Sequence, residues 1–450
     1  MTTRPPLRVA HFSDLHYGPR NLVEADRCFG AAIERAVDVG VDVAVISGDS
    51  TDHALDLHSP SAVALVSRVR GLADHCPVLM LQGTWSHEPP GTLSVFRELG
   101  GRHAVHVGDR IGQVGLTAGG DWVVSPGWSF DALPDGLVGL FSCLPSVNRA
   151  VVAAALGAAD AAGATGEHVA ALLRGLASNH AMARQLGLPT LLVSHGTVFG
   201  CITEHGVPMA GFDHEFTTGS LFDAGAQAVL LGHIHRHQCW ERDDGGGRRC
   251  IAYAGSIGRF HHGEAGDKGF LLWQVGPDSA TCRLEATPAR RTVDICFDGK
   301  PDLATLRAAL VAQPVAGAWV RLRWSVPEEE RNDVDRAAMR ELLAGAASVQ
   351  FEGRILPVVR VRSGGIGQAG AMRDKVAAWA GVVGARPEPL WSCLDELAVR
   401  ETQRIVDAAL AEPGAATAAG AQHPGAEAQG DLKVLELAGD CLEVSSGAHA

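Results

Sequence analysis

The chain has 450 residues, which is too long for one ordinary hydrophobic core and predicts two domains with additional segments. Its 46% hydrophobic and 20% charged residues are typical of a globular protein. A formal net charge of −13 excludes an overall basic surface for nucleic acid, although a local patch beside bound cations can still receive phosphates. The ten cysteines form no Cys-x-x-Cys pair and no zinc-type spacing, so we expect reduced thiols. Because no membrane-spanning or signal segment is recognisable, a cytoplasmic location is expected.

Short apolar segments alternate with helical segments in the first part of the chain. We predict buried strands at residues 7–12, 41–47, 78–81, 190–194 and 228–231. Helices are predicted at residues 22–39 and 61–73, with an Ala-rich helical insertion at about 144–187. Each predicted strand ends directly at polar residues, and sites in α/β folds collect on the loops after the carboxyl ends of strands.

A hairpin is predicted next, because residues 236–242 and 248–254 flank the turn sequence Asp-Asp-Gly-Gly-Gly. A closing strand is expected at residues 268–276 and a domain boundary near residue 290. Beyond it, the pattern predicts strands at 293–297, 319–326 and 355–361, with helices at about 302–312, 329–345, 370–382 and 391–411. We therefore expect domains at residues 1–290 and 291–411, then a low-complexity acidic tail at 412–450.

Five clusters of candidate metal ligands follow the predicted strands. They are Asp14-x-His16, Gly48-Asp49, Gly83-Thr84-Trp85-Ser86-His87-Glu88, Ser194-His195-Gly196 and Gly232-His233-Ile234-His235. Carboxylate oxygens and imidazole nitrogens are ligands of the divalent cations used in two-metal phosphoester hydrolysis. Taken alone, Asp49 could cap a helix, and His195 could be a buried core histidine. Their joint occurrence in this order favours a two-metal site.

The order of these clusters resembles the signature of the calcineurin-like metallophosphoesterase superfamily, D-x-H, G-D, G-N-H-[DE], a later His and G-H-x-H. The resemblance implies an α/β (α+β) fold, a two-sheet β-sandwich flanked by helices and followed by a smaller α+β capping domain. It also implies two divalent metal ions, with Asp49 bridging them as a catalytic ligand. Its implied ligand sets are Asp14, His16, Asp49 and His235 for one metal, and Asp49, His195 and His233 for the other. His87 would match the histidine that stabilises the transition state or protonates the leaving oxygen.

The third cluster departs from the family signature. The signature has an Asn that ligates the second metal, whereas this chain has Ser86 directly before His87. We expect Ser86 to stand in as a ligand, although a neutral hydroxyl is a poorer ligand than an amide carbonyl. Thr84 and Glu88 are the alternative donors in this cluster.

A narrower resemblance comes from the segment Tyr253-Ala-Gly-Ser-Ile-Gly-Arg-Phe-His-His-Gly-Glu264, followed by Lys268-Gly-Phe. It is similar to the Y-P-G-S-x-x-R-x-x-F-G-E…K-G-F stretch of SbcD-type DNA-repair exonuclease subunits, with Ala254 in place of Pro and His262 in place of Phe. This implies a manganese-dependent nuclease that processes DNA ends in double-strand-break repair. It also implies an SbcC-type ABC ATPase partner and a homodimer. The alternative for the segment is a purely structural strand-loop-strand.

The module after residue 290 resembles the capping domain of the same nucleases. Five arginines there are candidates for contacts with DNA phosphates, and a solvated face of mixed charge is the alternative. They are Arg321, Arg323, Arg354, Arg360 and Arg362. The helix expected at 391–411 is a candidate docking element for the ATPase.

Two other functions are compatible with the residues. A small-molecule phosphatase or cyclic-nucleotide phosphodiesterase would use the same metals, and the acidic net charge favours it. A non-catalytic scaffold that binds DNA ends is supported only by the altered third cluster. The cap-like module and the Tyr253–Phe270 stretch argue against the small-molecule enzyme. The seven other matching positions, including both histidines of Gly-His-x-His, argue against the scaffold.

Overall fold

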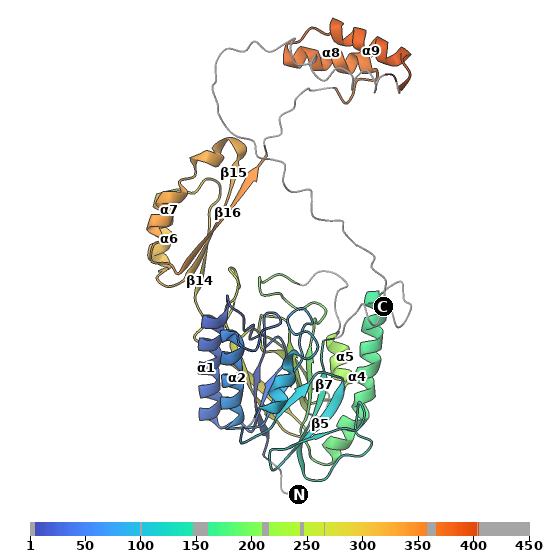
Figure 1. The fold of residues 1–450 in the computed structure, drawn as a ribbon, viewed down its shortest axis with the longest axis vertical. Coiled ribbons are helices and arrows are strands. Elements are labelled where there is room, and N and C mark those ends of the chain that lie inside the picture. The colour runs from blue at the N-terminus through green and yellow to red at the C-terminus, as the bar shows by residue number, and fades with distance from the viewer. Residues whose placement is uncertain are drawn as a thin grey trace, which may run out of the picture. The chain divides into compact units, whose positions relative to one another are not determined.

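The computed structural model describes residues 5–99, 101–146, 161–208, 216–243, 247–264, 266–357, 366–402 and 404. The chain forms two compact units, Met1–Pro357 and Val358–Ala450 (Figure 1). The domain boundary predicted at residue 290 lies within the first unit. Arg360 and Arg362, the predicted tail and the segment 147–160 of the predicted insertion lie outside the described residues.

The first unit contains a six-stranded sheet in the order β13-β12-β1-β2-β3-β4. Strands β1 to β4 are parallel, whereas β12 runs antiparallel to β1 and to β13. The strands are β1 (Leu7–Phe12), β2 (Val43–Ile46), β3 (Val78–Leu81), β4 (Val105–Gly108), β12 (Gly269–Val275) and β13 (Ala280–Ala286). One face packs on α1 (Leu22–Val39) and α2 (Pro60–Ala73), and the 3-10 helix η1 (Thr92–Glu98) precedes β4.

A seven-stranded sheet has the order β10-β11-β9-β8-β7-β5-β6. Four strands, β7, β8, β9 and β11, are parallel to one another. At the edges, β5 pairs antiparallel with both β7 and β6, and β10 pairs antiparallel with β11. The strands are β5 (Gly112–Thr117), β6 (Trp122–Val124), β7 (Leu137–Leu144), β8 (Thr190–His195), β9 (Ala228–Gly232), β10 (Gln238–Asp243) and β11 (Arg248–Tyr253). Its outer face packs on α4 (Ala161–Gln185) and α5 (Thr218–Asp223).

These two sheets pack face to face on one buried core. Alternate residues of β1 and β2, such as Val9 and Val45, share this core with Leu191 and Leu230 from β8 and β9. Because successive strand residues point to opposite faces, the other residues of the same strands contact the flanking helices. The predicted α/β class is therefore confirmed, with mixed sheets covered by helices.

A third, all-parallel sheet follows, in the order β14-β15-β16. Its elements are β14 (Thr292–Cys296), α6 (Leu303–Ala312), β15 (Trp319–Pro327), η2 (Glu328–Asp333), α7 (Arg336–Leu342) and β16 (Ser348–Leu356). Two sequence predictions are wrong here. The helix expected at 329–345 is divided by Val334 and Asp335, where Asp335 caps α7. The last strand begins at Ser348 and ends at Leu356, whereas the prediction placed it at 355–361.

The second unit, as far as it is described, contains two helices, α8 (Met372–Val383) and α9 (Glu388–Val399). The indole N–H of Trp391 donates a hydrogen bond to the Arg373 carbonyl, and Arg373 pairs with Asp395. The helix predicted at 391–411 begins earlier, at Glu388, and ends at Val399, while residues 403 and 405–411 are outside the described part. Among the described residues, no helix has the length and apolar character needed to cross a bilayer.

Candidate metal centre

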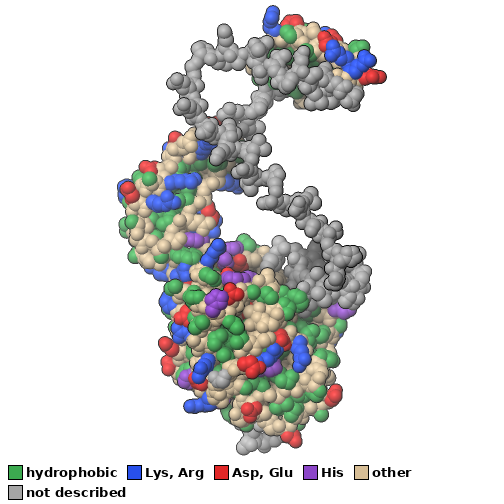
Figure 2. Space-filling model, in the orientation of Figure 1, with side chains coloured by type: hydrophobic (Ala, Val, Ile, Leu, Met, Phe, Trp, Pro, Cys, Tyr) green, Lys and Arg blue, Asp and Glu red, His purple; other side chains and the backbone are tan. Residues whose placement is uncertain are grey.

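The predicted ligands lie at the carboxyl ends of strands from both sheets of the sandwich. Asp14 and His16 follow β1, and Asp49 follows β2 in the first sheet. His195 is the last residue of β8, and His233 and His235 lie in the loop after β9, so these three come from the second sheet. In Figure 2, histidine side chains gather with acidic ones at the end of the sandwich that is next to the third sheet. The carboxyl ends of neighbouring parallel strands lie side by side at one edge of a sheet. Residues that are far apart in the sequence therefore meet there.

The backbone at this end of the sandwich is strained. Among the described residues, only four non-glycine residues have a positive φ, and all four are predicted ligands. They are Asp14 (49°), His16 (47°), Asp49 (52°) and His233 (102°). Side chains with a Cβ rarely adopt this conformation, and such outliers persist where the surrounding structure holds them for function. The strain therefore supports a functional site at the predicted ligands.

Two glycines of the predicted motifs leave no room for a side chain. A Cβ on Gly48, whose φ is +104°, would lie 2.3 Å from Nδ1 of His195. A Cβ on Gly232 would lie 2.4 Å from the carbonyl oxygen of Ser47. Both glycines therefore allow the ends of β2, β8 and β9 to approach closely enough for their ligands to converge.

One group of potential ligands consists of Asp14, His16 and His235, whose ligand atoms lie within 4.8 Å of one another. The Nε2 atoms of His16 and His235 are 2.9 Å apart, and Asp14 Oδ1 is 4.0 Å from His235 Nε2. Asp14 also accepts hydrogen bonds from Ser13 Oγ at 2.6 Å and from the backbone N–H of His233. Two imidazoles that face each other over a buried carboxylate are a donor set that suits a divalent cation.

Each of these two imidazoles has a carboxylate on its other side. His16 Nδ1 lies 3.6 Å from Asp52, and His235 Nδ1 lies 3.7 Å from Glu264. Both Nδ1 atoms are buried without a hydrogen-bond partner within normal reach. Metal-binding histidines commonly direct one N–H to a carboxylate, which leaves the lone pair of the other nitrogen for the metal. Asp52 was not predicted from the sequence, because an acidic residue three positions after Asp49 belongs to no motif.

A second group consists of Asp49, His195 and His233, again within 4.8 Å. The Asp49 carboxylate is 3.2 Å from His195 Nε2, and His195 Nδ1 donates a hydrogen bond to the Ser47 carbonyl at 2.8 Å. Burial alone would lower the pKa of His195, but Asp49 raises it to about 10. Burial would raise the pKa of Asp49, whereas His195 and His16 hold it far below its usual range. Histidines of both ligand groups therefore stabilise the ionised form of Asp49.

The hydroxyl group beside the second group belongs to Thr84. Its Oγ1 lies 3.1 Å from Asp49 Oδ2 and 3.2 Å from His195 Nε2, and its backbone N–H donates to Asp49 Oδ1 at 2.6 Å. Ser86, which the sequence favoured as the replacement ligand, is exposed to solvent. Of the donors considered for the altered third cluster, Thr84 is therefore the one in contact with Asp49 and His195.

Glu88 joins two ligand loops instead of facing the ligands. Its fully buried carboxylate accepts hydrogen bonds from the backbone N–H groups of Ser50 and Gly83, each at 2.5 Å. Burial, followed by the negative charge of Asp49, raises the pKa of Glu88 to about 7. Glu88 thus fixes the loop after β3 to the loop after β2, which places Thr84 on Asp49.

His87 lies beside the first group. Its ring centroid is 4.9 Å from that of His16, and it forms a third set of close side chains with His16 and Asp52. The Nδ1 of His87 contacts the backbone carbonyl of Asp52 at 2.7 Å, so in the neutral ring the proton is on Nδ1. The ring is only half-buried, which allows it to reach a substrate at the edge of the centre.

The Tyr253–Lys268 segment supports the centre directly. The fully buried ammonium of Lys268 pairs with Glu264 at 2.6 Å and donates to the His235 carbonyl at 2.7 Å and to Ser256 Oγ at 2.9 Å. The Tyr253 hydroxyl donates to the Gly196 carbonyl at 2.6 Å, next to His195. Burial would raise the pKa of Glu264, but His235 and Lys268 lower it. The segment therefore holds the loops of both candidate ligand groups.

Two of the five arginines proposed for phosphate contacts are paired with a carboxylate. Arg321 binds Asp294 at 2.5 Å and is only 17% exposed, and Arg323 binds the same carboxylate at 3.0 Å. Arg354 is exposed on β16. The ring of Trp319 on β15 stacks on His262 with ring centroids 4.8 Å apart. The third sheet thus contacts the same segment that supports His235.

No family model and no curated protein matches the chain. The inference about function therefore rests on the arrangement of its own side chains. Buried Asp and His residues in two adjacent groups, with carboxylates behind the imidazoles, fit two divalent cations in their chemistry.

Proposed function

We propose that this protein is a metal-dependent phosphodiesterase that cleaves DNA, similar to the SbcD-type nucleases. The single observation that carries the metal-dependent part is the convergence of Asp14, His16 and His235 in one group and Asp49, His195 and His233 in another. The carboxylate–imidazole pairs behind His16 and His235 support it, because they are typical of metal sites.

In the proposed mechanism, Asp14, His16 and His235 would hold one divalent cation and Asp49, His195 and His233 a second one. Bound divalent cations, Mn²⁺ by the resemblance, would neutralise phosphate charge and lower the pKa of water. Thr84 and Glu88 fix the position of Asp49, so its carboxylate needs no rearrangement when substrate binds. His87 lies at the half-buried edge of the centre, where its ring, protonated on both nitrogens, would donate the Nε2 proton to the departing oxygen.

The choice of DNA as substrate rests on the resemblance of the Tyr253–Lys268 segment to the nucleases. Its contacts with Trp319 connect the centre to the third sheet, which would lie over a long substrate as the capping domain does in that family. A partner ATPase and a homodimer remain predictions from the same resemblance. The second unit offers a small apolar groove for a partner, lined by Met372, Val376, Trp379, Leu390, Leu394 and Leu397.

A small-molecule phosphodiesterase is the second candidate. The observation that favours it is the pairing of Arg321 and Arg323 with Asp294, because both guanidinium groups already have a carboxylate partner. With a net charge of −13, such a chain would repel a long polyanion more than a small phosphodiester.

The deciding experiment uses end-labelled linear duplex DNA and bis-p-nitrophenyl phosphate, each with Mn²⁺. The variant Asp49→Ala removes the carboxylate of the second group, and Asp56→Ala, an exposed aspartate in the same region, is the matched control. Release of nucleotides by the wild type and by Asp56→Ala, with loss in Asp49→Ala, supports the nuclease. Cleavage of the small ester alone supports the second candidate. If neither substrate is cleaved with or without an ATPase partner, the catalytic proposal fails.

A further inference from the structure

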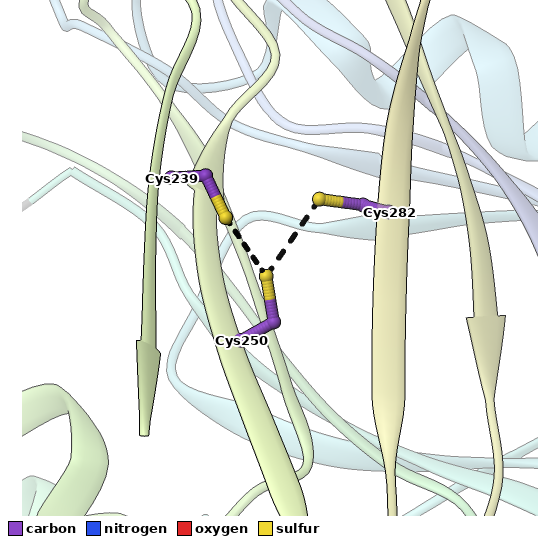
Figure 3. Close-up of side chains that lie close together, drawn as sticks. All are labelled: Cys239, Cys250 and Cys282. Atoms are coloured by element: carbon purple, nitrogen blue, oxygen red, sulfur yellow. Dashed lines mark hydrogen bonds between the residues drawn. The ribbon is translucent and has the colours of Figure 1, made fainter. Parts of the chain in front are cut away.

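Three cysteine thiols that belong to none of the sequence motifs described above lie close together. Cys239 on β10, Cys250 on β11 and Cys282 on β13 have sulfur atoms within 4.8 Å of one another. The Cys250 sulfur lies 3.2 Å from that of Cys239 and 3.6 Å from that of Cys282, and Figure 3 shows all three side chains pointing to a common point. No pair of them has the short spacing of a zinc motif, so the sequence did not predict this cluster.

The cluster joins the two sheets of the sandwich. β10 and β11 form one edge of the seven-stranded sheet, while β13 is the edge strand of the six-stranded sheet. Cys250 is fully buried, Cys282 is half-buried and Cys239 is exposed. The sulfur atoms can therefore be reached from solvent on the Cys239 side, while the other two are fixed by the core.

Cys239 lies beside the thiols of Cys250 and Cys282, and the imidazole of His237 and the guanidinium of Arg248 are also near it. The thiolate is the form of cysteine that binds metals. A bound cation would favour ionisation of all three thiols.

The geometry suits a metal better than a disulfide. Cys239 is opposite Ala252 in the β10–β11 register, so Cys250 is its diagonal neighbour. Diagonal Cα atoms are about 7–8 Å apart, which exceeds the usual reach of about 4.4–6.8 Å for a disulfide. Tetrahedral Zn²⁺ with metal–sulfur bonds of about 2.3 Å separates its sulfur ligands by about 3.8 Å. The two short sulfur–sulfur distances approach that value, and a disulfide would leave the third thiol unused.

We propose that Cys239, Cys250 and Cys282 form a binding site for a soft, thiophilic metal ion such as Zn²⁺, which ties the two sheets together at their edge. The site is separate from the Asp and His centre and does not depend on the proposed phosphodiesterase function. Binding would replace the three S–H protons by metal–sulfur bonds and release those protons to solvent.

Titration of the reduced, metal-free full chain with Co²⁺ tests the proposal. Sulfur ligands give an intense near-ultraviolet charge-transfer absorption that oxygen and nitrogen ligands do not, so the Asp and His centre does not interfere. We expect this absorption in the wild type and its displacement by Zn²⁺. Cys239→Ser and Cys282→Ser should weaken Co²⁺ affinity by at least about tenfold. Cys296→Ser, an exposed cysteine outside the cluster, should leave it unchanged.

Three results would overturn the proposal. The first is the absence of the charge-transfer absorption in the wild type. The second is an absorption that persists at full intensity in both Cys239→Ser and Cys282→Ser. The third is a wild type that binds no Co²⁺ but loses two hydrogen masses in air through a Cys239–Cys250 disulfide, which would assign the cluster to redox chemistry. Cys239 is exposed, so its serine variant should keep the fold, and circular dichroism verifies this.

Discussion

At the scale of single residues, the third cluster is decided by which hydroxyl reaches Asp49. The sequence favoured Ser86 because it directly precedes His87, as the family's Asn does. In the fold, the chain after β3 makes a turn in which the backbone N–H groups of His87 and Glu88 both donate to the Thr84 carbonyl. That turn directs Thr84 inward and leaves Ser86 in solvent. The spacing of a motif therefore predicted the location of the donor but not which hydroxyl it would be.

Replacing the two hydroxyl residues separates these roles. Thr84→Ala removes the Oγ1 contacts with Asp49 and His195, so Mn²⁺ affinity should fall by about tenfold or more, in the range seen for groups that orient metal ligands. Ser86→Ala, the matched control at an exposed position, should be unchanged. Isothermal titration calorimetry measures both affinities. A loss confined to Ser86→Ala would restore the assignment made from the sequence.

The buried pair of Glu264 and Lys268 gives a second residue-scale prediction. Glu264→Gln leaves the Lys268 ammonium without its counter-charge and should lower the free energy of unfolding by about 3 kcal/mol. It also removes the carboxylate 3.7 Å from His235, so metal affinity should fall by about 10–100-fold. Denaturant unfolding and metal titration measure the two effects.

The double variant Glu264→Gln/Lys268→Met distinguishes charge from positioning. It removes both charges, so part of the lost stability should return, while metal affinity should stay low because His235 still lacks its carboxylate. Recovery of both quantities in the double variant would contradict a positioning role for Glu264.

At the scale of secondary structure, the sequence predicted best where one pattern dominates. β1 and α1 have the predicted bounds, 7–12 and 22–39, because a mainly apolar segment predicts the strand and a helical periodicity predicts the helix. The predicted hairpin is confirmed as β10 and β11. The ligand clusters follow β1 and other mainly apolar strands, so the positions of the candidate ligands could also be predicted.

Several strands were not predicted, for physical reasons. β5 and β7 contain glycines and polar residues, as in Gly112–Thr117, so their character comes from pairing across the sheet and not from local composition. Asp52 was equally hidden, and the motif that contains Glu264 did not indicate its contact with His235, because only the tertiary fold brings these carboxylates to histidines. Contacts between distant segments have no local signature.

Glu24 links α1 to two loops, and its ionisation should make stability depend on pH. Burial would raise its pKa, but backbone N–H groups of Arg290 and Arg259 donate to it and the charge of Arg290 adds to this, so the pKa is lowered. A carboxylate whose pKa is lowered in the folded state stabilises the fold when it is ionised. This contribution is fully present above pH 4.5, the ordinary pKa of the group. This contribution is lost as the pH falls below that value.

The variant Glu24→Gln tests this linkage. It should lower the free energy of unfolding at pH 7 by about 2 kcal/mol, because a buried charged acceptor is lost. The difference from wild type should shrink as the pH falls below 4.5, where the wild-type carboxylate becomes protonated. Glu34→Gln, at an exposed position of the same helix, is the matched control. A difference that stays constant from pH 7 to pH 3 would rule out the ionic origin.

At the scale of the whole molecule, metal binding should stabilise the first unit. A ligand that binds only the folded state at a hundred times its dissociation constant adds about 2.7 kcal/mol. We therefore expect Mn²⁺ to raise the melting temperature relative to EDTA-treated protein, and Asp49→Ala to lose most of this response. Scanning calorimetry measures the shift. An equal shift in the wild type and Asp49→Ala would mean that the cation binds elsewhere.

Both candidate ligand groups take side chains from both sheets: Asp14 and Asp49 come from the first, His195 and His235 from the second. A slip of one sheet past the other by one residue, about 3.3 Å, would separate both groups at once. The centre therefore depends on the alignment of two layers whose shared core is apolar. A substitution in the shared core, far from any ligand, would be detected first as weakened metal binding, before the protein loses its fold.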